Sequence, residues 1–62
     1  MTDSPSTILL VEDDATLRPT LALNLRAEGY RVLEAEDGET GLAAARGETP
    51  DLVVLDVMLP RL

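Results

Sequence analysis

ILLVEDD, at residues 8–14, is the stretch that decides the predicted fold of this 62-residue chain. It is a continuous apolar run that ends abruptly in carboxylates, and LVVLD at residues 52–56 has the same form. Continuous apolarity is typical of strands that are buried on both faces of a parallel sheet. A further strand is predicted between them at residues 30–35 (YRVLEA), where apolar and polar residues partly alternate.

The segment after the first strand predicts a helix. Its evidence is a stripe of leucines at every fourth position: Leu17, Leu21 and Leu25. Such a stripe forms the apolar face of a helix, and Gly29 supplies a stop signal. Either Thr16 or Asp14 is the expected N-terminal cap. Pro19 fits the first turn if Thr16 is the cap, because a proline further inside would remove a hydrogen bond.

A second helix is predicted at residues 39–46, which include three alanines and one leucine. Asp37 precedes it as a turn residue and a candidate cap. Gly47 and Pro50 are expected to end it. Gly41 lies inside and is expected to weaken the helix by about 1 kcal/mol relative to alanine.

Strands and helices therefore alternate as β-α-β-α-β, which predicts an α/β fold with a parallel sheet and right-handed crossovers. With the first strand central, the strand order is 2-1-3 and one helix covers each face. This is half of a flavodoxin-like doubly wound fold, whose ligand site lies where the strand order reverses. We expect a disordered leader at residues 1–7 and one partial domain at residues 8–62.

Composition excludes several kinds of chemistry. The chain has no cysteine, histidine or lysine, and its 12 acidic and 5 basic residues give a net charge of −7. Thiol nucleophiles, zinc–thiolate sites and imidazole bases are therefore excluded. The acidic balance disfavours nucleic acid and anionic membranes as partners. The first residues are polar and acidic, unlike a signal peptide, and no apolar run is long enough to span a membrane, so a cytoplasmic location is expected.

Carboxylates end two strands that are neighbours in the predicted sheet. Glu12 and Asp13 follow the first strand and Asp56 follows the third, so the topology brings all three to one edge. Carboxylates about 5 Å apart repel each other by roughly 3 kcal/mol per pair at an effective dielectric near 20. A divalent cation would offset this repulsion, and all-oxygen ligation favours Mg²⁺, Mn²⁺ or Ca²⁺. An ionised aspartate beside such a cation can attack a phosphoryl group, so the predicted chemistry is formation of an aspartyl phosphate.

Three stretches carry a family resemblance: ILLVEDD at residues 8–14, GYRVLEAEDG at 29–38 and PDLVVLDVMLP at 50–60. The chain resembles the N-terminal half of a response-regulator receiver domain of two-component signalling. The resemblance implies a signalling protein, not an enzyme, that takes phosphate from a sensor histidine kinase.

Carried over position by position, the resemblance makes Asp56 the phosphoacceptor. It implies that Glu12, Asp13, Asp56 and the main-chain carbonyl of Met58 hold Mg²⁺, with Mn²⁺ as a substitute. Asp14 lies just past the acidic pair and is a weaker candidate for the metal.

The chain also departs from the family pattern. A receiver domain continues for two strands and three helices, which carry a switch Ser or Thr and a Lys that contacts the phosphoryl group. Neither position is present in this chain. We therefore expect either part of a longer response regulator or a short protein that dimerises through its third strand. The second case gives an alternative function, a half-receiver association module that is not phosphorylated.

Several polar residues have a structural interpretation instead. The acidic run at residues 12–14 is compatible with a solvated strand end followed by a helix cap, where acids suit the helix dipole. Asp37 is expected to be a turn and cap residue, and Asp51 to mark the start of the third strand. Arg31 and Arg46 are expected to be solvated surface charges.

Overall fold

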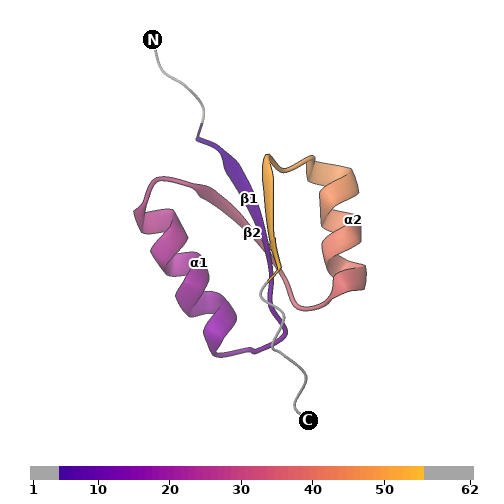
Figure 1. Ribbon diagram of the computed structural model, residues 1–62, viewed down its shortest axis with the longest axis horizontal. Coiled ribbons are helices and arrows are strands. Elements are labelled where there is room, and N and C mark those ends of the chain that lie inside the picture. The colour runs from indigo at the N-terminus through magenta and orange to yellow at the C-terminus, as the bar shows by residue number, and fades with distance from the viewer. Residues whose placement is uncertain (1–4, 56–62) are drawn as a thin grey trace.

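The computed structural model describes residues 5–55 of the chain. In chain order the elements are β1 (Thr7–Val11), α1 (Leu17–Ala27), β2 (Arg31–Ala35), α2 (Gly38–Glu48) and β3 (Leu52–Leu55), as Figure 1 shows. The strands form one parallel sheet in the order β2-β1-β3. The βαβαβ pattern and the 2-1-3 order predicted from the sequence are both confirmed.

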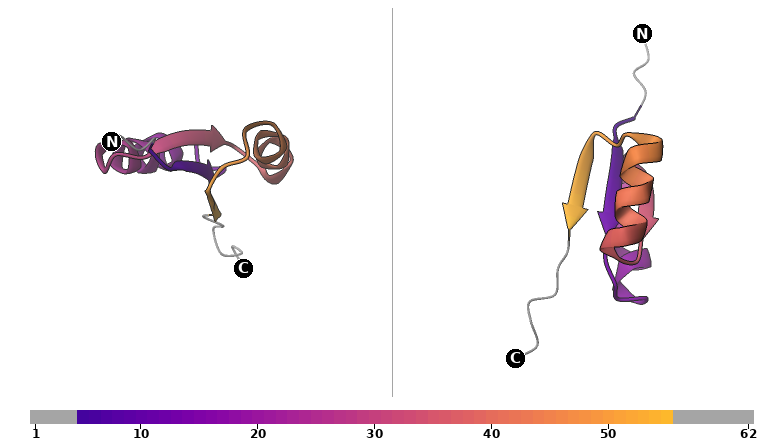
Figure 2. Two further views of the ribbon diagram at one scale, coloured as in Figure 1. Left: turned by 90° about the horizontal axis from the view of Figure 1, so that it is seen from above. Right: turned by 90° about the vertical axis from the view of Figure 1, so that its right-hand side faces the viewer.

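Strand β1 is the centre of the molecule. It pairs with β2 on one edge and with β3 on the other, while α1 and α2 lie on opposite sides of the sheet (Figures 1 and 2). Its residues Ile8, Leu9 and Leu10 are therefore almost fully buried. A strand enclosed in this way has no solvent-facing side, which is why its sequence is apolar without alternation.

The first strand begins slightly earlier than the sequence indicates. β1 starts at Thr7, and the carbonyl of Ser6 already accepts a 2.9 Å hydrogen bond from the N–H of Arg31. Of the predicted leader, Ser6 is thus hydrogen-bonded to β2 and Thr7 belongs to β1. Residues 1–4 lie outside the described part of the chain.

Helix α1 closes one face of the sheet. Ala22 of α1 is buried against Leu10 of β1 and Val32 of β2. Half-buried apolar side chains pack around this cluster: Leu21, Leu25 and Val54. The leucine stripe identified in the sequence is therefore the core-facing side of α1.

The ends of α1 show which of the sequence signals act. Asp14 is the cap, because its Oδ1 accepts 2.8 Å hydrogen bonds from the N–H groups of Thr16 and Leu17, whereas the Thr16 side chain makes no capping bond. Although Asp14 supplies the capping side chain, Thr16 stands at the N-cap position directly before Leu17, so Pro19 lies in the first turn of α1. At the other end Gly29 has φ of 101°. The N–H of Gly29 bonds to the carbonyl of Arg26 and that of Tyr30 to Leu25, which is a Schellman motif.

Helix α2 has the predicted cap, but it begins one residue earlier and ends two residues later than predicted. The Asp37 side chain caps it by accepting a 2.7 Å hydrogen bond from the N–H of Thr40. The helix continues through Gly47 to Glu48 and stops at Thr49, which has φ of 45°. Thr49 precedes Pro50, and a residue before proline is disfavoured in the right-handed helical region. The proline therefore ends the helix, while Gly47 remains inside it.

Gly41 has a packing role that the sequence pattern does not reveal. It is buried where α2 crosses β1, and a Cβ atom at this position would lie 2.8 Å from Cγ2 of Val11 and 3.7 Å from Cβ of Ala35. The absence of a side chain lets the helix approach the sheet closely. Glycine at position 41 thus lowers the helix propensity of α2 but permits this close contact with β1.

We predict that Gly41→Ala lowers the free energy of unfolding by about 1–2 kcal/mol, because overpacking against Val11 outweighs the gain in helix propensity. Gly47→Ala, in the same helix but with no atom within 4 Å of the new Cβ, is the matched control and should raise it by about 0.5–1 kcal/mol. Urea denaturation followed by far-UV circular dichroism measures both. Equal shifts in the two variants would contradict the packing role.

Candidate functional site

The candidate site lies at the carboxyl edge of the sheet, directly after β1. Val11, the last residue of β1, pairs with Ala35 of β2 and with Leu55 of β3. The N–H of Glu12 donates a 3.0 Å hydrogen bond to the carbonyl of Ala35, which extends the β1–β2 ladder by one residue. Glu12 and Asp13 therefore leave the sheet from its middle strand, at the point where the strand order reverses.

The two acidic residues differ in their surroundings. Glu12 is only 1% exposed, and its Oε2 accepts a 2.8 Å hydrogen bond from the N–H of Asp14. Residues two apart on a strand share a face, so Glu12 follows Leu10 on the side of the sheet that α1 covers. Asp13 is exposed. The interpretation of residues 12–14 as a merely solvated strand end does not describe Glu12, because its carboxylate is buried.

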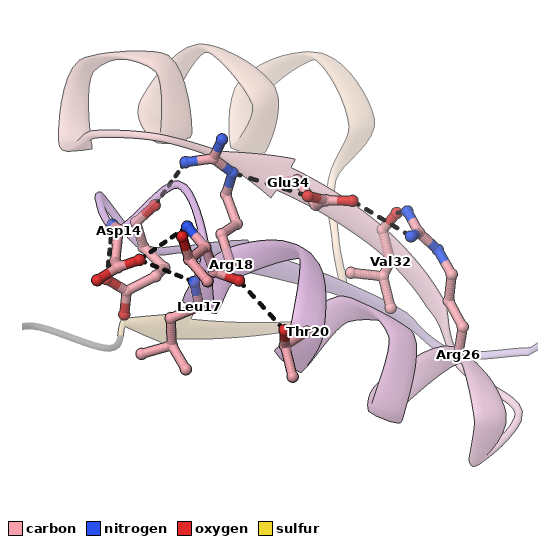
Figure 3. A network of polar contacts seen from close by, with 9 residues as sticks. Asp14, Leu17, Arg18, Thr20, Arg26, Val32 and Glu34 are labelled. Atoms are coloured by element: carbon pink, nitrogen blue, oxygen red, sulfur yellow. Dashed lines mark hydrogen bonds and ion pairs between the residues drawn. The ribbon is translucent and has the colours of Figure 1, made fainter.

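A network of charged side chains connects this edge to α1 and β2 (Figure 3). Arg18 of α1 donates a 2.9 Å hydrogen bond from its Nη1 to the main-chain carbonyl of Glu12. Its Nε lies 3.7 Å from Oε1 of Glu34 on β2. The other carboxylate oxygen of Glu34 lies 3.2 Å from Nη1 of Arg26, and Arg26 also donates to the carbonyl of Val32. Figure 3 shows the Glu34 carboxylate between the two guanidinium groups.

The sequence alone does not reveal this network. Arg18, Arg26 and Glu34 carry no motif of their own, and their contacts require β2 to lie beside α1. The only usable signal was two arginines on a helix of a strongly acidic chain. The predicted surface charges Arg31 and Arg46, in contrast, are exposed as expected.

Three other aspartates have structural partners. Hydrogen bonds from the N–H groups of Leu17 and Thr16, helped by the charge of Arg18, hold the pKa of Asp14 below its usual value. The hydrogen bond from the N–H of Thr40 lowers the pKa of Asp37. Asp51, at the opposite edge of the sheet, accepts a 2.7 Å hydrogen bond from the N–H of Thr7. The structural interpretations of Asp37 and Asp51 fit these contacts.

The described residues include two of the four predicted metal ligands. Glu12 and Asp13 offer carboxylate oxygens, which are the donors that Mg²⁺ prefers. Asp56 and Met58, the other predicted ligands, lie outside the described residues. Within residues 5–55 no group of three or more acidic, histidine or cysteine side chains is arranged to hold a metal ion. The two donors that are described fit a magnesium ion in chemical type.

Comparison with known proteins identifies the family. The family model of the response regulator receiver domain matches residues 8–62. The chain belongs to this family. Receiver domains are signalling modules of two-component systems, they pair with sensor histidine kinases, and they are typically Mg²⁺-dependent. The resemblance drawn from the three sequence stretches is thereby confirmed.

Two of the similar proteins are transcriptional regulatory proteins that are much longer than this chain. The receiver chain is 53% identical over 53 residues to the transcriptional regulatory protein AfsQ1 of Streptomyces coelicolor, which covers 86% of this chain and 24% of that protein. It is 51% identical over 55 residues to the alkaline phosphatase synthesis transcriptional regulatory protein PhoP of Bacillus subtilis, covering 89% of this chain and 23% of that protein. The chain thus spans about a quarter of the length of these relatives.

Neither α1 nor α2, the helices of the described residues, has the length and apolarity that crossing a membrane requires.

The caps predict a dependence of stability on acid. Because the pKa values of Asp14 and Asp37 are lowered in the folded state, the unfolded state binds more protons once the pH falls below about 3.9, the ordinary pKa of aspartate. Their contribution is complete above that pH and is lost as the pH falls through the folded-state values. We expect the urea midpoint to drop in this range.

Asp37→Asn should reduce that drop, since an asparagine still accepts the Thr40 N–H but does not titrate. Glu48→Gln removes one charge at the other end of α2 and is the control, expected to keep the acid dependence of the parent chain. If the urea midpoint of Asp37→Asn falls with pH in parallel with that of the parent chain, the contribution assigned to the Asp37 cap is contradicted.

Proposed function

We propose that this chain is the phosphoacceptor part of a cytoplasmic response regulator and that Asp56 takes a phosphoryl group from a sensor histidine kinase. Mg²⁺, or Mn²⁺ in its place, would be held by Glu12, Asp13, Asp56 and the main-chain carbonyl of Met58. The observation that carries the proposal is the position of Glu12 and Asp13 at the carboxyl end of the central strand, one residue past the pairing of Val11 with Leu55.

Covalent geometry supports the role of Asp56. Asp56 directly follows Leu55 in the sequence, and consecutive Cα atoms are about 3.8 Å apart across a trans peptide bond. Leu55 is in turn the register partner of Val11, which immediately precedes Glu12. The chain connections on both strands thus favour a short distance between the acidic pair and the proposed acceptor.

The proposed reaction is a phosphoryl transfer. An Oδ atom of Asp56 attacks the phosphorus, the P–N bond to the kinase imidazole breaks, and its electron pair stays on the imidazole nitrogen. The product is an acyl phosphate. The carboxylate form of Asp56 needs no general base, because it carries no proton that must be removed before it attacks. The cation would supply charge neutralisation between the carboxylates and the incoming phosphoryl group. The residues of the chain hold the cation and present the nucleophile.

We predict that the purified chain, incubated with acetyl phosphate and Mg²⁺, gains the mass of one phosphoryl group in a native mass spectrum. Here the P–O bond breaks and acetate leaves. Asp56→Asn should abolish the adduct, because an amide is not a nucleophile in this reaction. Asp51→Asn changes an aspartate at the other end of β3 and is the matched control, because an asparagine there still accepts the N–H of Thr7. It should retain the adduct.

Chelation of the cation should also suppress the adduct in the parent chain. An adduct that persists in Asp56→Asn would refute the acceptor assignment. No adduct in any sample, with a folded parent chain, would favour the alternative function below.

A second candidate function, the half-receiver association module, is favoured by the exposure of β3. β3 stands at the end of the strand order, so its outer edge is unpaired among residues 5–55. Leu52 and Leu55 are 55% and 61% exposed, and an apolar groove between α2 and β3 is lined by both Val53 and Leu42. An unprotected apolar edge strand is a site for pairing with another strand. Two copies could join their β3 strands about a two-fold axis.

This candidate predicts that the chain sediments as a concentration-dependent dimer and that Leu52→Lys shifts it to monomer, because a lysine on an edge strand blocks pairing. Leu23→Lys is the matched control: Leu23 is 67% exposed on α1, and its substitution adds the same charge away from the β3 edge. It should leave the dimer intact. A parent chain that remains monomeric at all concentrations would rule out association through β3.

A further inference from the structure

The feature that carries a further inference is the hydrogen bond to the Glu12 carbonyl. Nη1 of Arg18 donates to this oxygen at 2.9 Å. The carbonyl belongs to the planar peptide unit that joins Glu12 to Asp13, so its oxygen moves rigidly with the Cα atoms of both residues. One contact from α1 therefore constrains the main-chain orientation of both members of the acidic pair. Strand pairing constrains the same segment through the N–H of Glu12.

Arg18 is itself held in place. Its side chain is 19% exposed, and Glu34 faces its Nε from β2. Glu34 is fixed from the other side by Arg26, whose guanidinium also bonds to the carbonyl of Val32. The planar fork of arginine lets one side meet the carboxylate while the other donates to the carbonyl. A lysine ammonium has no such fork.

We propose that Arg18 is a positioning residue that orients the Glu12–Asp13 peptide and thereby the Glu12 carboxylate for the divalent cation. The consequence for the cation rests on the proposed function, whereas the orientation of Glu12 does not. Partners that orient metal ligands typically change metal affinity by roughly 10–100-fold when they are removed. Arg18 acts through the main chain of the ligand residue instead of through its carboxylate.

Charge and geometry predict opposite effects, which makes the proposal testable. The positive charge of Arg18 repels a cation, so an effect of charge alone would make Mn²⁺ bind more tightly to Arg18→Gln and unchanged to Arg18→Lys. Positioning predicts weaker binding in both variants, because neither side chain reproduces the fork. The protein also contains a matched control: Arg26 likewise pairs with Glu34 and donates to a main-chain carbonyl, but it does not contact Glu12.

The first measurement is a Mn²⁺ titration of the parent chain, Arg18→Gln, Arg18→Lys and Arg26→Gln, followed by water-proton relaxation. We expect both Arg18 variants to bind roughly tenfold or more weakly. Arg26→Gln, which acts on Arg18 only through Glu34, should lose much less affinity. Tighter binding by Arg18→Gln, or equal losses at Arg18 and Arg26, would overturn the proposal.

The second measurement needs no metal. The N–H of Asp14 donates to Oε2 of Glu12, so its exchange with water reports how firmly the Glu12 carboxylate is held. We expect faster Asp14 exchange in both Arg18 variants and little change in Arg26→Gln, relative to the buried amide of Leu10 as the reporter of global stability. Asp14 exchange that only follows Leu10 exchange would show a merely structural role and overturn the proposal.

The two measurements separate the two claims. If Asp14 exchange responds to Arg18 as expected but the parent chain binds no Mn²⁺, the orientation of Glu12 by Arg18 stands and the proposed metal function fails. If the parent chain binds Mn²⁺ and Asp14 exchange is unaffected in the Arg18 variants, the metal function stands and the positioning role fails.

Discussion

The structure depends on the enclosure of one strand. β1 has a hydrogen-bonded neighbour on each edge and a helix on each face, and its three central residues are almost fully buried. Removing this apolar surface from water is the main favourable term available to so short a chain. The same enclosure fixes the site, because the residues that follow β1 must emerge at the middle of the carboxyl edge. Glu12 still belongs to the β1–β2 ladder through its N–H, so the start of the acidic pair is part of the sheet.

Main-chain N–H donors and two arginines stabilise several of the carboxylates that give the chain its excess of negative charge. Asp14, Asp37 and Asp51 each accept hydrogen bonds from main-chain N–H groups, where a carboxylate is stabilised by the donors and, at the helix starts, by the helix dipole. Glu34 lies between Arg18 and Arg26. These contacts assign a structural role to Asp14, Asp37, Asp51 and Glu34. The Glu12–Asp13 pair stands at the switch point of the sheet.

The two faces of the sheet are covered by their helices to different degrees. On the α1 face Leu10, Ala22 and Val32 form a closed cluster. On the α2 face the helix approaches the sheet closely where Gly41 meets Val11, and towards β3 an apolar groove remains. The relatives are about four times as long as this chain. β3 is therefore the least enclosed strand of the described structure, with the side chains of Leu52, Val53 and Leu55 exposed.

The order of the elements, the parallel sheet and the family were predictable from the sequence alone, and the 2-1-3 strand order followed once the first strand was taken as central. These follow from local patterns: apolar runs of strand length, a leucine stripe, and caps such as Asp37 that bond within three residues. The sequence did not determine that Glu12 is buried while Asp13 is exposed, that Gly41 is required by Val11, or that Arg18 reaches the Glu12 carbonyl while Glu34 lies between two arginines. Nor did it predict the end of α2 correctly, because the helix continues through Gly47 to Glu48. The burial and the long-range contacts depend on the tertiary structure, because every such contact joins residues on different elements. The geometry of these contacts exists only once α1 and α2 have packed on opposite faces of the sheet.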